Sequence, residues 1–224
     1  MAVAHAPAVR VRARRPGQLR PGPGLPRVSV AGHQRERLLA AIADVSLQVG
    51  LQAATVAQIA AQAGVSKRTF YEHFDDKDEL FLAACGRASA QMHGTVNRAF
   101  ISVQGEWPAR MVGALDALLM FLAADPARAH LCVAGAHVVR RPAGRDHDRP
   151  LEFFVEYLEL APAGRCTPVP PLAAQIVIGG LQQVLCSRIL DGCARELPAL
   201  LPGLAYGTLV PYLGAQETRK ELSR

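Results

Sequence analysis

The sequence lacks the short motifs that usually mark a catalytic site. It contains no Gly-x-Ser-x-Gly turn, no His-Glu-x-x-His pair, no glycine-rich phosphate loop and no Cys-x-x-Cys pair. It also lacks runs of alternating apolar and polar residues, which are typical of half-buried strands. We therefore expect an all-α protein that is not an enzyme and needs no cofactor.

Acidic residues are absent from the first 31 positions, which hold six arginines and five of the sixteen prolines. The rest of the chain carries 19 Lys and Arg against 19 Asp and Glu, so the net charge of +6 belongs to this segment. Such a composition does not form a packed core. We expect residues 1–32 to be a disordered basic tail, either a dispensable extension or an arm that attracts DNA nonspecifically. No apolar signal segment follows the arginines, so we expect a cytoplasmic protein.

The five cysteines show no disulfide or metal-binding spacing. In a protein that is not exported, they should stay reduced and pack as small apolar side chains. His130 and His137 share a helix face, but Cys132 points elsewhere on that helix and no carboxylate lies nearby. We therefore expect no metal site.

Residues 166–187 carry no charge, which raises the question of a membrane span. Prolines interrupt the beginning of this stretch, and its three glutamines would be costly in lipid. We expect a dimer interface here instead, because Gly179 and Gly180 would let a partner helix approach closely. Ordinary packing within the chain is the alternative.

Residues 55–80 have the pattern of a helix-turn-helix that runs into a further helix. Apolar residues at positions 56, 59, 60 and 63 fall on one helix face. Thr55 and Gln58 have the spacing of a capping box at its start. Gly64 suits a left-handed turn, and Ser66 is placed to cap the second helix.

The second helix should bury Phe70 and Phe74 and present polar side chains elsewhere. Recognition helices have this composition, because hydrogen-bonding and basic side chains bind base edges and phosphates. A solvated face with an Arg68–Glu72 ion pair is the alternative. The candidate DNA-binding residues are Thr55, Ser66, Lys67, Arg68, Thr69, Tyr71, His73 and Lys77, with Arg35 and Arg37 as weaker candidates.

Lys77 favours the DNA-binding interpretation. It follows Asp75 and Asp76, one of which should cap the next helix, and so places a cation at the positive end of the helix dipole. A DNA phosphate bound at this helix terminus would explain that placement.

The segment GVSKRTFYEHFDDKDEL at residues 64–80, with Thr55, Ile59 and Ala60 upstream, closely resembles the DNA-binding signature of the TetR family of bacterial transcription regulators. The resemblance covers about residues 34–84. It implies a three-helix domain joined to the start of a fourth helix. Arg68 is a departure, since many members have a small residue there, and it leaves the base preference open. The resemblance also implies a homodimer bound to a palindromic double-stranded DNA operator.

The apolar periodicity predicts a first helix over 34–49 and a long helix from Lys77 to Phe100. Further helices are expected near 108–124, 127–140, 148–161, 172–190 and 197–212. We divide the chain into the tail, a DNA-binding domain at 33–80, a ligand-binding and dimerisation domain at 81–215, and a C-terminal tail at 216–224. By resemblance the last two long helices form the dimer interface, with Ile176, Gly179, Gly180, Gln183, Leu204 and Thr208.

The resemblance further implies an effector held by the C-terminal domain. The candidate lining residues are Met92, Phe100, Trp107, Met111, Phe121, His130, His137, Phe154 and Tyr157, for each of which core packing is the alternative. The sequence thus predicts a regulator, in particular a repressor released by a small hydrophobic or aromatic molecule. Two alternatives stay open: a regulator of this fold without an effector, and an enzyme that uses the C-terminal helices.

Overall fold

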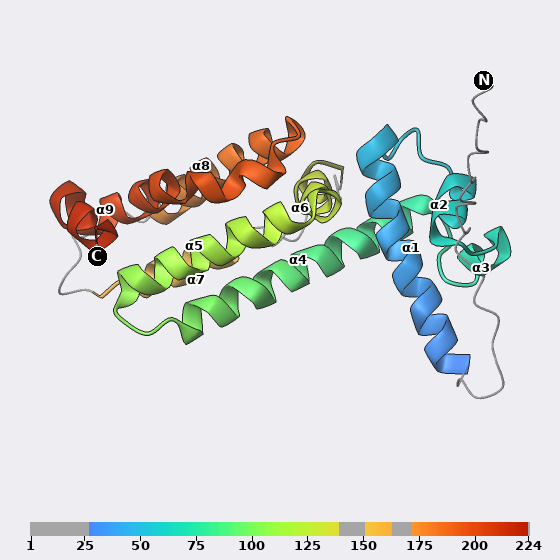
Figure 1. Cartoon of the computed structure of the whole chain (residues 1–224), viewed down its shortest axis with the longest axis horizontal. Helices are drawn as coiled ribbons and strands as arrows, with labels where there is room; N and C mark the ends of the chain where they lie inside the picture. The colour runs from blue at the N-terminus through green and yellow to red at the C-terminus, as the bar shows by residue number, and fades with distance from the viewer. Residues whose placement is uncertain (1–26, 139–150, 163–171, 224) are drawn as a thin grey trace, which may run out of the picture.

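The computed structural model describes residues 27–138, 151–162 and 172–223, except for the side chains of 27–29 and 134–138. Every regular element within these ranges is helical. The N-terminal helices gather at one end of the molecule, and the helices of the C-terminal part lie side by side across the rest of it (Figure 1). The all-α fold with a helix-turn-helix domain and a helical C-terminal domain is confirmed. The expected tail lies outside the described residues up to position 26.

The N-terminal domain consists of α1 (Arg27–Val49), α2 (Val56–Ala63), α3 (Lys67–Tyr71) and the first turns of α4 (Lys77–Ser102). Fully buried side chains from all four helices meet in a common core. These residues are Leu38, Ile42, Ile59, Phe70 and Leu80, each 0% exposed. The predicted apolar stripes are therefore the faces that pack.

The first helix begins earlier than the sequence pattern predicted. It starts at Arg27 instead of Gln34, so residues 27–32, expected to be part of the tail, are helical. The last tail proline is Pro26, and every later residue of α1 keeps the amide hydrogen that a helix needs. Ala31, Gly32 and His33 are exposed. Apolar periodicity could not reveal this extension, because it packs against little of the protein.

The C-terminal domain is built around α5 (Trp107–Ala124), which lies against α4 on one side and against the last two helical segments on the other. Met111, Leu115 and Leu118 of α5 are fully buried. The domain is completed by α6 (Pro126–Val138), α7 (Phe153–Glu159), α8 (Ala173–Leu190), the 3₁₀ helix η1 (Ala194–Leu200) and α9 (Leu201–Leu222).

Aromatic side chains tie α4, α5 and α7 together. The indole Nε1 of Trp107 donates a 2.7 Å hydrogen bond to the backbone oxygen of Tyr157. The Tyr157 ring stacks on Phe100 at a centroid distance of 4.3 Å, and its hydroxyl lies 3.1 Å from Oδ1 of Asn97. A buried indole and phenol need such partners, so these contacts fix the three helices relative to one another.

Among the described residues, two helices, α5 and α8, are long and apolar enough to cross a membrane by length and composition alone. Helix α5 is apolar because it lies at the centre of the core. Only 22% of α8 is buried within the chain, so its apolar character needs another explanation.

Two expected boundaries differ from those of the structure. Helix α7 covers Phe153–Glu159 of the helix expected near 148–161, of which residues 148–150 lie outside the described residues. Residues 216–222, expected as a tail, are helical: Gly214 has a left-handed φ of 76° that redirects the chain, and α9 continues beyond it. The Thr218 hydroxyl then donates to the Gly214 carbonyl at 2.8 Å and is buried. The polar composition of this segment concealed its packing.

Candidate nucleic-acid interface and cavities of the C-terminal domain

The start of α2 is fixed by the predicted capping box. The Gln58 amide donates to Thr55 Oγ1 at 3.3 Å, and the Thr55 amide donates to Gln58 Oε1 at 2.9 Å. Two backbone donors that the helix cannot satisfy are thereby paired. Thr55 is exposed, but its hydroxyl already serves the helix start.

The turn between α2 and α3 favours glycine at position 64, because its φ of 62° lies in the left-handed region. The Arg37 guanidinium lies close to this glycine and would have to shift to admit a Cβ atom. The amides of Gly64 and Val65 donate to Ala61 and Ala60 at 3.1 and 2.9 Å, which is a Schellman ending of α2. The angle at which α3 leaves α2 is therefore set by the backbone.

Helix α3 is short, and a capping hydrogen bond and buried aromatic contacts hold it in place. The Ser66 hydroxyl accepts from the Thr69 amide at 3.0 Å, as predicted for a cap. Phe70 is fully buried and packs on Phe74 with ring centroids 6.3 Å apart. The Tyr71 ring meets the edge of Phe70 at 5.3 Å. These contacts stiffen α3, while the Tyr71 ring remains 58% exposed.

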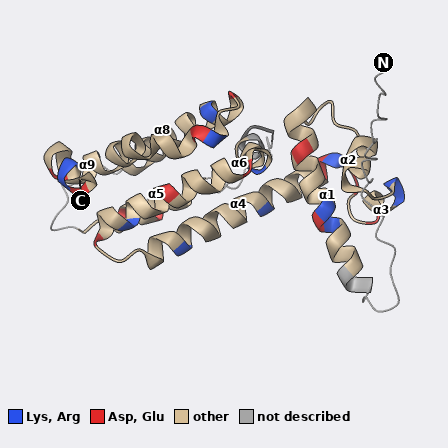
Figure 2. Cartoon of the chain, in the orientation of Figure 1, with Lys and Arg blue, Asp and Glu red and all other residues tan. Residues whose placement is uncertain are grey.

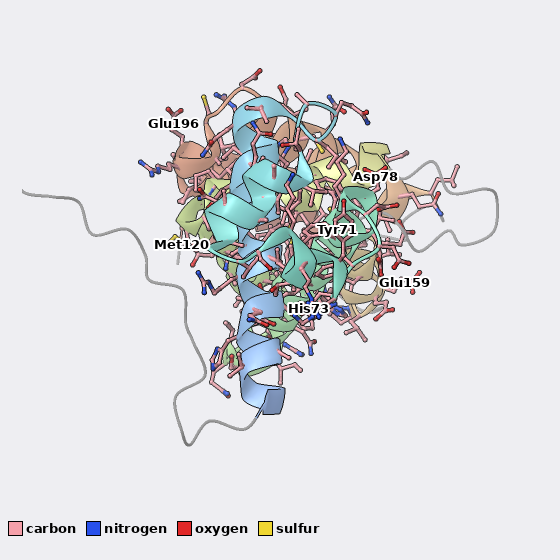
Figure 3. The ribbon with its side chains drawn as sticks, turned by 90° about the vertical axis from the view of Figure 1, so that its right-hand side faces the viewer. Tyr71, His73, Asp78, Met120, Glu159 and Glu196 are labelled. Atoms are coloured by element: carbon pink, nitrogen blue, oxygen red, sulfur yellow. The ribbon has the colours of Figure 1, made fainter. Side chains whose placement is uncertain are left out.

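Helix α3 and the turn after it carry five of the eight predicted DNA-binding residues. Lys67, Arg68 and Tyr71 are exposed, and Thr69 and His73 are half-buried beside them. Figure 3 looks onto this end of the molecule, where Tyr71 and His73 lie on the same face. Basic residues mark α3 at the outer end of the domain (Figure 2).

Arg68 forms the ion pair that the alternative interpretation anticipated. Its Nε lies 3.1 Å from Glu72 Oε1, while 90% of the Arg68 side chain remains exposed. An ion pair in that setting is worth about 0–1 kcal/mol. A nucleic acid could therefore take Arg68 away from Glu72 at little cost.

Lys77 has a different environment from the one expected. Its ammonium group donates to the backbone oxygens of Leu51, Gln52 and Ala54 at 2.9, 2.9 and 3.0 Å. The predicted cap of α4 is Asp76, whose carboxylate accepts from the Glu79 amide at 2.7 Å. The loop carbonyls, rather than a phosphate, thus explain why a lysine sits at this helix start.

Two arginines of α1, Arg35 and Arg37, brace the same domain. Arg35 lies over the Phe74 ring at 5.2 Å, and Arg37 lies against Gly64. Arg87 of α4 forms an ion pair with Glu36. The sequence predicted Arg35 and Arg37 as weaker DNA-binding candidates, and their bracing contacts had no signal in the local pattern.

Two cavities lie beside α8 in the C-terminal domain. The first, called the apolar chamber below, has a volume of about 20 Å³. It is lined by Met92, Leu122, Cys132, Val133, Leu151, Gln182, Leu185, Cys186 and Ile189. The second, called the polar groove, has a volume of about 260 Å³. It is lined by Glu152, Val155, Gln175, Ile178, Gly179, Gln182, Gln183 and Cys186.

Of the predicted effector residues, Met92 lines the apolar chamber. Seven others line neither of these two cavities: Phe100, Trp107, Met111, Phe121, His130, Phe154 and Tyr157. Most of them pack in the core, which was the alternative weighed for each. His130 is half-buried, and desolvation lowers the pKa of its imidazole. The side chain of His137 lies outside the described residues.

The thiol of Cys132 is poorly suited to react as a nucleophile. Burial raises its pKa to about 12, and burial does the same for Cys85. Since the thiolate is the reactive form, these groups act as apolar wall and core atoms at neutral pH.

The residues predicted for a dimer interface occupy two different environments. Ile176 is 72% exposed, and Gly179, Gly180 and Gln183 share its open face of α8. Leu204 is half-buried. Thr208, by contrast, is only 3% exposed within its own chain, so α9 turns this residue inward. The predicted face of α9 was therefore wrong at Thr208.

The comparisons with known proteins agree with this geometry. Residues 38–84 match the family model described as bacterial regulatory proteins, tetR family. The repressor BepR of Brucella suis is 40% identical over 58 residues, which cover 26% of this chain and 28% of BepR. The activator FasR of Mycolicibacterium smegmatis is 41% identical over 81 residues, covering 34% and 35%. The chain thus spans about a third or less of the length of these two curated relatives.

Solved structures extend the similarity to the fold of both domains. FadR of Bacillus subtilis, solved in complex with stearoyl-CoA, has a TM-score of 0.61 at 17% identity and covers 79% of this chain and 97% of FadR. SmeT, the repressor of a Stenotrophomonas maltophilia multidrug efflux pump, has a TM-score of 0.63 at 17% identity and covers 80% and 90%.

The arrangement as a whole defines a class: helix-turn-helix proteins in which a long helix connects a small N-terminal domain to a helical C-terminal one. Residues 38–84 match the TetR family of bacterial regulatory proteins, and the fold of the described helices is similar to that of FadR and SmeT.

Proposed function

We propose that this protein is a dimeric, sequence-specific DNA-binding regulator of transcription, and specifically a repressor that a small molecule releases from its operator. The observation that carries the proposal is the exposed face of α3, where Lys67, Arg68 and Tyr71 project from a helix whose inner side is anchored by Phe70. Side chains of these types hold phosphates and base edges in the major groove.

The rigidity of the turn supports this use of α3. A recognition helix must keep its side chains in register with base edges, and the Schellman ending at Gly64 and the Ser66 cap hold α3 at one angle. Lys67 and Arg68 supply the positive charge for phosphate contacts, with Glu72 as the local counter-charge.

A second copy of the chain is the best partner for the open face of α8. Leu172, Ile176 and Leu190 are 61%, 72% and 58% exposed there, and Arg188 is the one charged residue of this helix (Figure 2). An apolar face of that kind is typical of a protein–protein interface. It also accounts for the low burial of α8 within one chain.

The glycines of α8 and α9 favour the same partner. Added Cβ atoms at Gly179, Gly180, Gly203 and Gly207 would meet nothing within 4 Å. Each glycine in a helix costs about 1 kcal/mol relative to alanine, and packing inside this chain does not explain it. Close approach of a partner's helices does, and a two-fold dimer implies a palindromic operator.

The apolar chamber and the polar groove support an effector. Both lie in the C-terminal domain against α8, the helix proposed to pair, so a ligand there could alter the geometry of the dimer. The stearoyl-CoA of Bacillus subtilis FadR makes an amphiphilic molecule a reasonable class to test. Repression of transcription is proposed by similarity to the repressor BepR, whereas FasR is an activator.

The decisive experiment is footprinting of the purified full-length protein on the DNA upstream of its own gene. We expect protection of a palindrome, with the two half-sites spaced by about one helical turn or more. The Arg68→Ala variant should lose the protection at protein concentrations that saturate the wild type. Absence of any protected site, or protection unchanged in a variant with Lys67, Arg68 and Tyr71 all replaced by Ala, would refute this use of α3.

One alternative to the proposed function is a DNA-binding regulator of the same fold that binds no effector. It predicts that no small molecule changes operator affinity, which a thermal-shift screen followed by DNA titration would reveal. An enzyme is the least supported alternative, because the similar proteins are transcription regulators and the groove's ionisable side chains are Glu152 and Cys186.

A further inference from the structure

Arg68 and Glu72 are joined by two hydrogen bonds at the end of α3. The Glu72 amide donates to the Arg68 carbonyl at 3.0 Å, and Nε of Arg68 donates to Glu72 Oε1 at 3.1 Å. Glu72 caps α3 in helical conformation, so its side chain leaves the backbone one turn beyond Arg68 on the same face. The carboxylate therefore meets the guanidinium from its Nε side.

The contact with Glu72 leaves the far end of the guanidinium available. A guanidinium has five N–H groups, of which one is on Nε and four are on Nη1 and Nη2. The Arg68 side chain is 90% exposed, so Nη1 and Nη2 are open to a ligand. At the end of the group they present two parallel N–H donors, which bind best to two neighbouring acceptors.

Guanine is the base whose major-groove edge matches two parallel donors. It presents N7 and O6 as neighbouring acceptors, whereas adenine has one acceptor beside a donor, thymine has one acceptor beside a methyl group, and cytosine has a donor. An arginine that donates through Nη1 and Nη2 therefore forms two hydrogen bonds with guanine. Because Nε takes no part in them, the contact with Glu72 can persist.

Glu72 also disfavours a phosphate as the partner of Arg68. Its carboxylate is 53% exposed and lies 3.1 Å from the Arg68 Nε, so a phosphate that approaches Arg68 also approaches a negative charge. Guanine N7 and O6 belong to a neutral base and meet much less of this repulsion. The neighbouring Lys67 is exposed and has Tyr71, not a carboxylate, four residues later, so it is better suited to a phosphate.

The Arg68 side chain is held at both of its ends. Its backbone lies between the Ser66 cap, which accepts from the Thr69 amide at 3.0 Å, and the fully buried Phe70. Its guanidinium is held by Glu72. A side chain that is already oriented loses less conformational entropy when it binds, so this arrangement favours a directed contact with one base.

We propose that Arg68 binds a guanine in each half-site of the operator through Nη1 and Nη2, and that Glu72 is the positioning residue that holds the guanidinium at Nε and steers it away from phosphates. This inference rests on the proposed function, since it names the base that the recognition helix selects.

The first test is selection of bound sequences from a random double-stranded DNA library by the full-length protein and by its Arg68→Ala variant. The wild type should enrich a palindrome with a guanine at one position of each half-site that the variant no longer selects. Lys67→Ala is the matched control, because it removes a cation from the same helix and leaves the Arg68–Glu72 pair intact. It should bind every sequence more weakly and still select this guanine.

The second test replaces the selected guanine of one half-site with 7-deazaguanine, which keeps Watson–Crick pairing and lacks the N7 acceptor. Fluorescence anisotropy should show that the wild type and Lys67→Ala lose about tenfold in affinity, the range expected when a bidentate contact is broken. Arg68→Ala should bind the two DNAs equally.

Two substitutions of Glu72 separate positioning from charge. Glu72→Gln and Glu72→Ala both remove one negative charge, so both should bind random DNA more tightly. Glutamine keeps an oxygen that can accept from Nε, whereas alanine has none. Glu72→Gln should therefore retain the preference for guanine over adenine at the selected position, while Glu72→Ala should lose about threefold of it, the cost of ordering a free side chain.

Three results would overturn the inference: a selected palindrome in which no guanine depends on Arg68, equal sensitivity of the wild type and Arg68→Ala to 7-deazaguanine, or equal guanine preference in Glu72→Gln and Glu72→Ala. Each of them leaves a protein that still selects an operator, so the regulator proposal would stand. Failure of that proposal has a different appearance, because a protein that enriches no sequence from the library is not a sequence-specific regulator.

Discussion

The ammonium nitrogen of Lys77 lies 3.0 Å from the carbonyl oxygen of Ala54, across the turn that leads into α2. The carbonyls of Leu51 and Gln52 accept its other two hydrogens at 2.9 Å. A lysine has three donors, so all of them are used inside the protein. Lys77 thus connects the start of α4 to the loop that follows α1, and with it positions the helix-turn-helix.

Replacing Lys77 with methionine should reduce stability more than it reduces phosphate binding. The variant keeps an apolar side chain of similar length and leaves three carbonyls without their donor, which we expect to cost about 1–3 kcal/mol of unfolding free energy. Urea unfolding measures this change. Where the variant is folded, its salt dependence of DNA binding should equal that of the wild type.

Lys67→Met is the matched control, because Lys67 is exposed on α3. It should change stability by less than about 0.5 kcal/mol. Its log–log salt slope should fall in magnitude by about 0.9, the value for a single phosphate neutralised by one cation. If the two variants exchange these phenotypes, Lys77 reaches the DNA after all.

Arg68 should determine which operator is bound. Arg68→Ala should weaken binding to the specific site by about 1–3 kcal/mol and binding to random DNA much less, because Arg68 can pair with a base only where the matching base is present. Fluorescence anisotropy on both DNAs measures the difference. Glu72→Gln, which removes the ion-pair partner and leaves Arg68 in place, should bind random DNA more tightly. A uniform weakening for Arg68→Ala would mean that Arg68 binds a phosphate.

Gly180→Leu should separate dimerisation from folding. The position faces open space in the single chain, so a larger side chain fits the fold but obstructs a close partner helix. We expect the wild type to sediment as a dimer at micromolar concentration and the variant to shift toward monomer. Leu82→Ala offers a comparison at an exposed apolar residue of α4, away from α8. Its dimer should persist, and a monomeric wild type would rule out the interface.

Deletion of the arginine-rich segment should alter only the ionic part of DNA binding. Because α1 begins at Arg27, the cut belongs after residue 26, where it removes five arginines and no acid. Folding, dimerisation and operator preference should be retained, while nonspecific affinity at low salt falls. The affinities of the two forms should converge as salt rises, because each phosphate that the segment neutralises adds about 0.9 to the salt slope. Identical slopes would mean that the segment does not touch DNA.

The sequence predicted well the helix-capping contacts, because both partners of each contact lie within about one helical turn. Thr55 with Gln58, Gly64, Ser66 and Asp76 each satisfy backbone groups three or four residues away, so their roles can be read from spacing. Lys77 could not be interpreted in this way. Its partners lie 23 to 26 residues earlier and meet it only when α1, α2 and α4 pack.

The lining of the cavities also could not be predicted from spacing along the sequence. An apolar residue at helical spacing is expected to face the interior, but the spacing does not say whether a neighbour fills the space in front of it. Met92 and Phe100 lie eight residues apart on α4 and are both buried, yet Met92 lines the chamber and Phe100 is covered by Tyr157. Thr208 is likewise buried within its own chain, although helical spacing had placed it on the predicted interface.

The buried side chains of α4 form one uninterrupted row that serves both domains. Leu80 and Phe81 complete the core of α1 and α2, and Met92, Val96 and Phe100 continue it into the C-terminal helices without a polar break. The two domains should therefore melt in a single transition, and a fragment that ends before α4 should not fold. A chimaera that joins this α3 to another regulator's effector domain would have to be cut inside a helix, with the packing on both sides of the junction preserved.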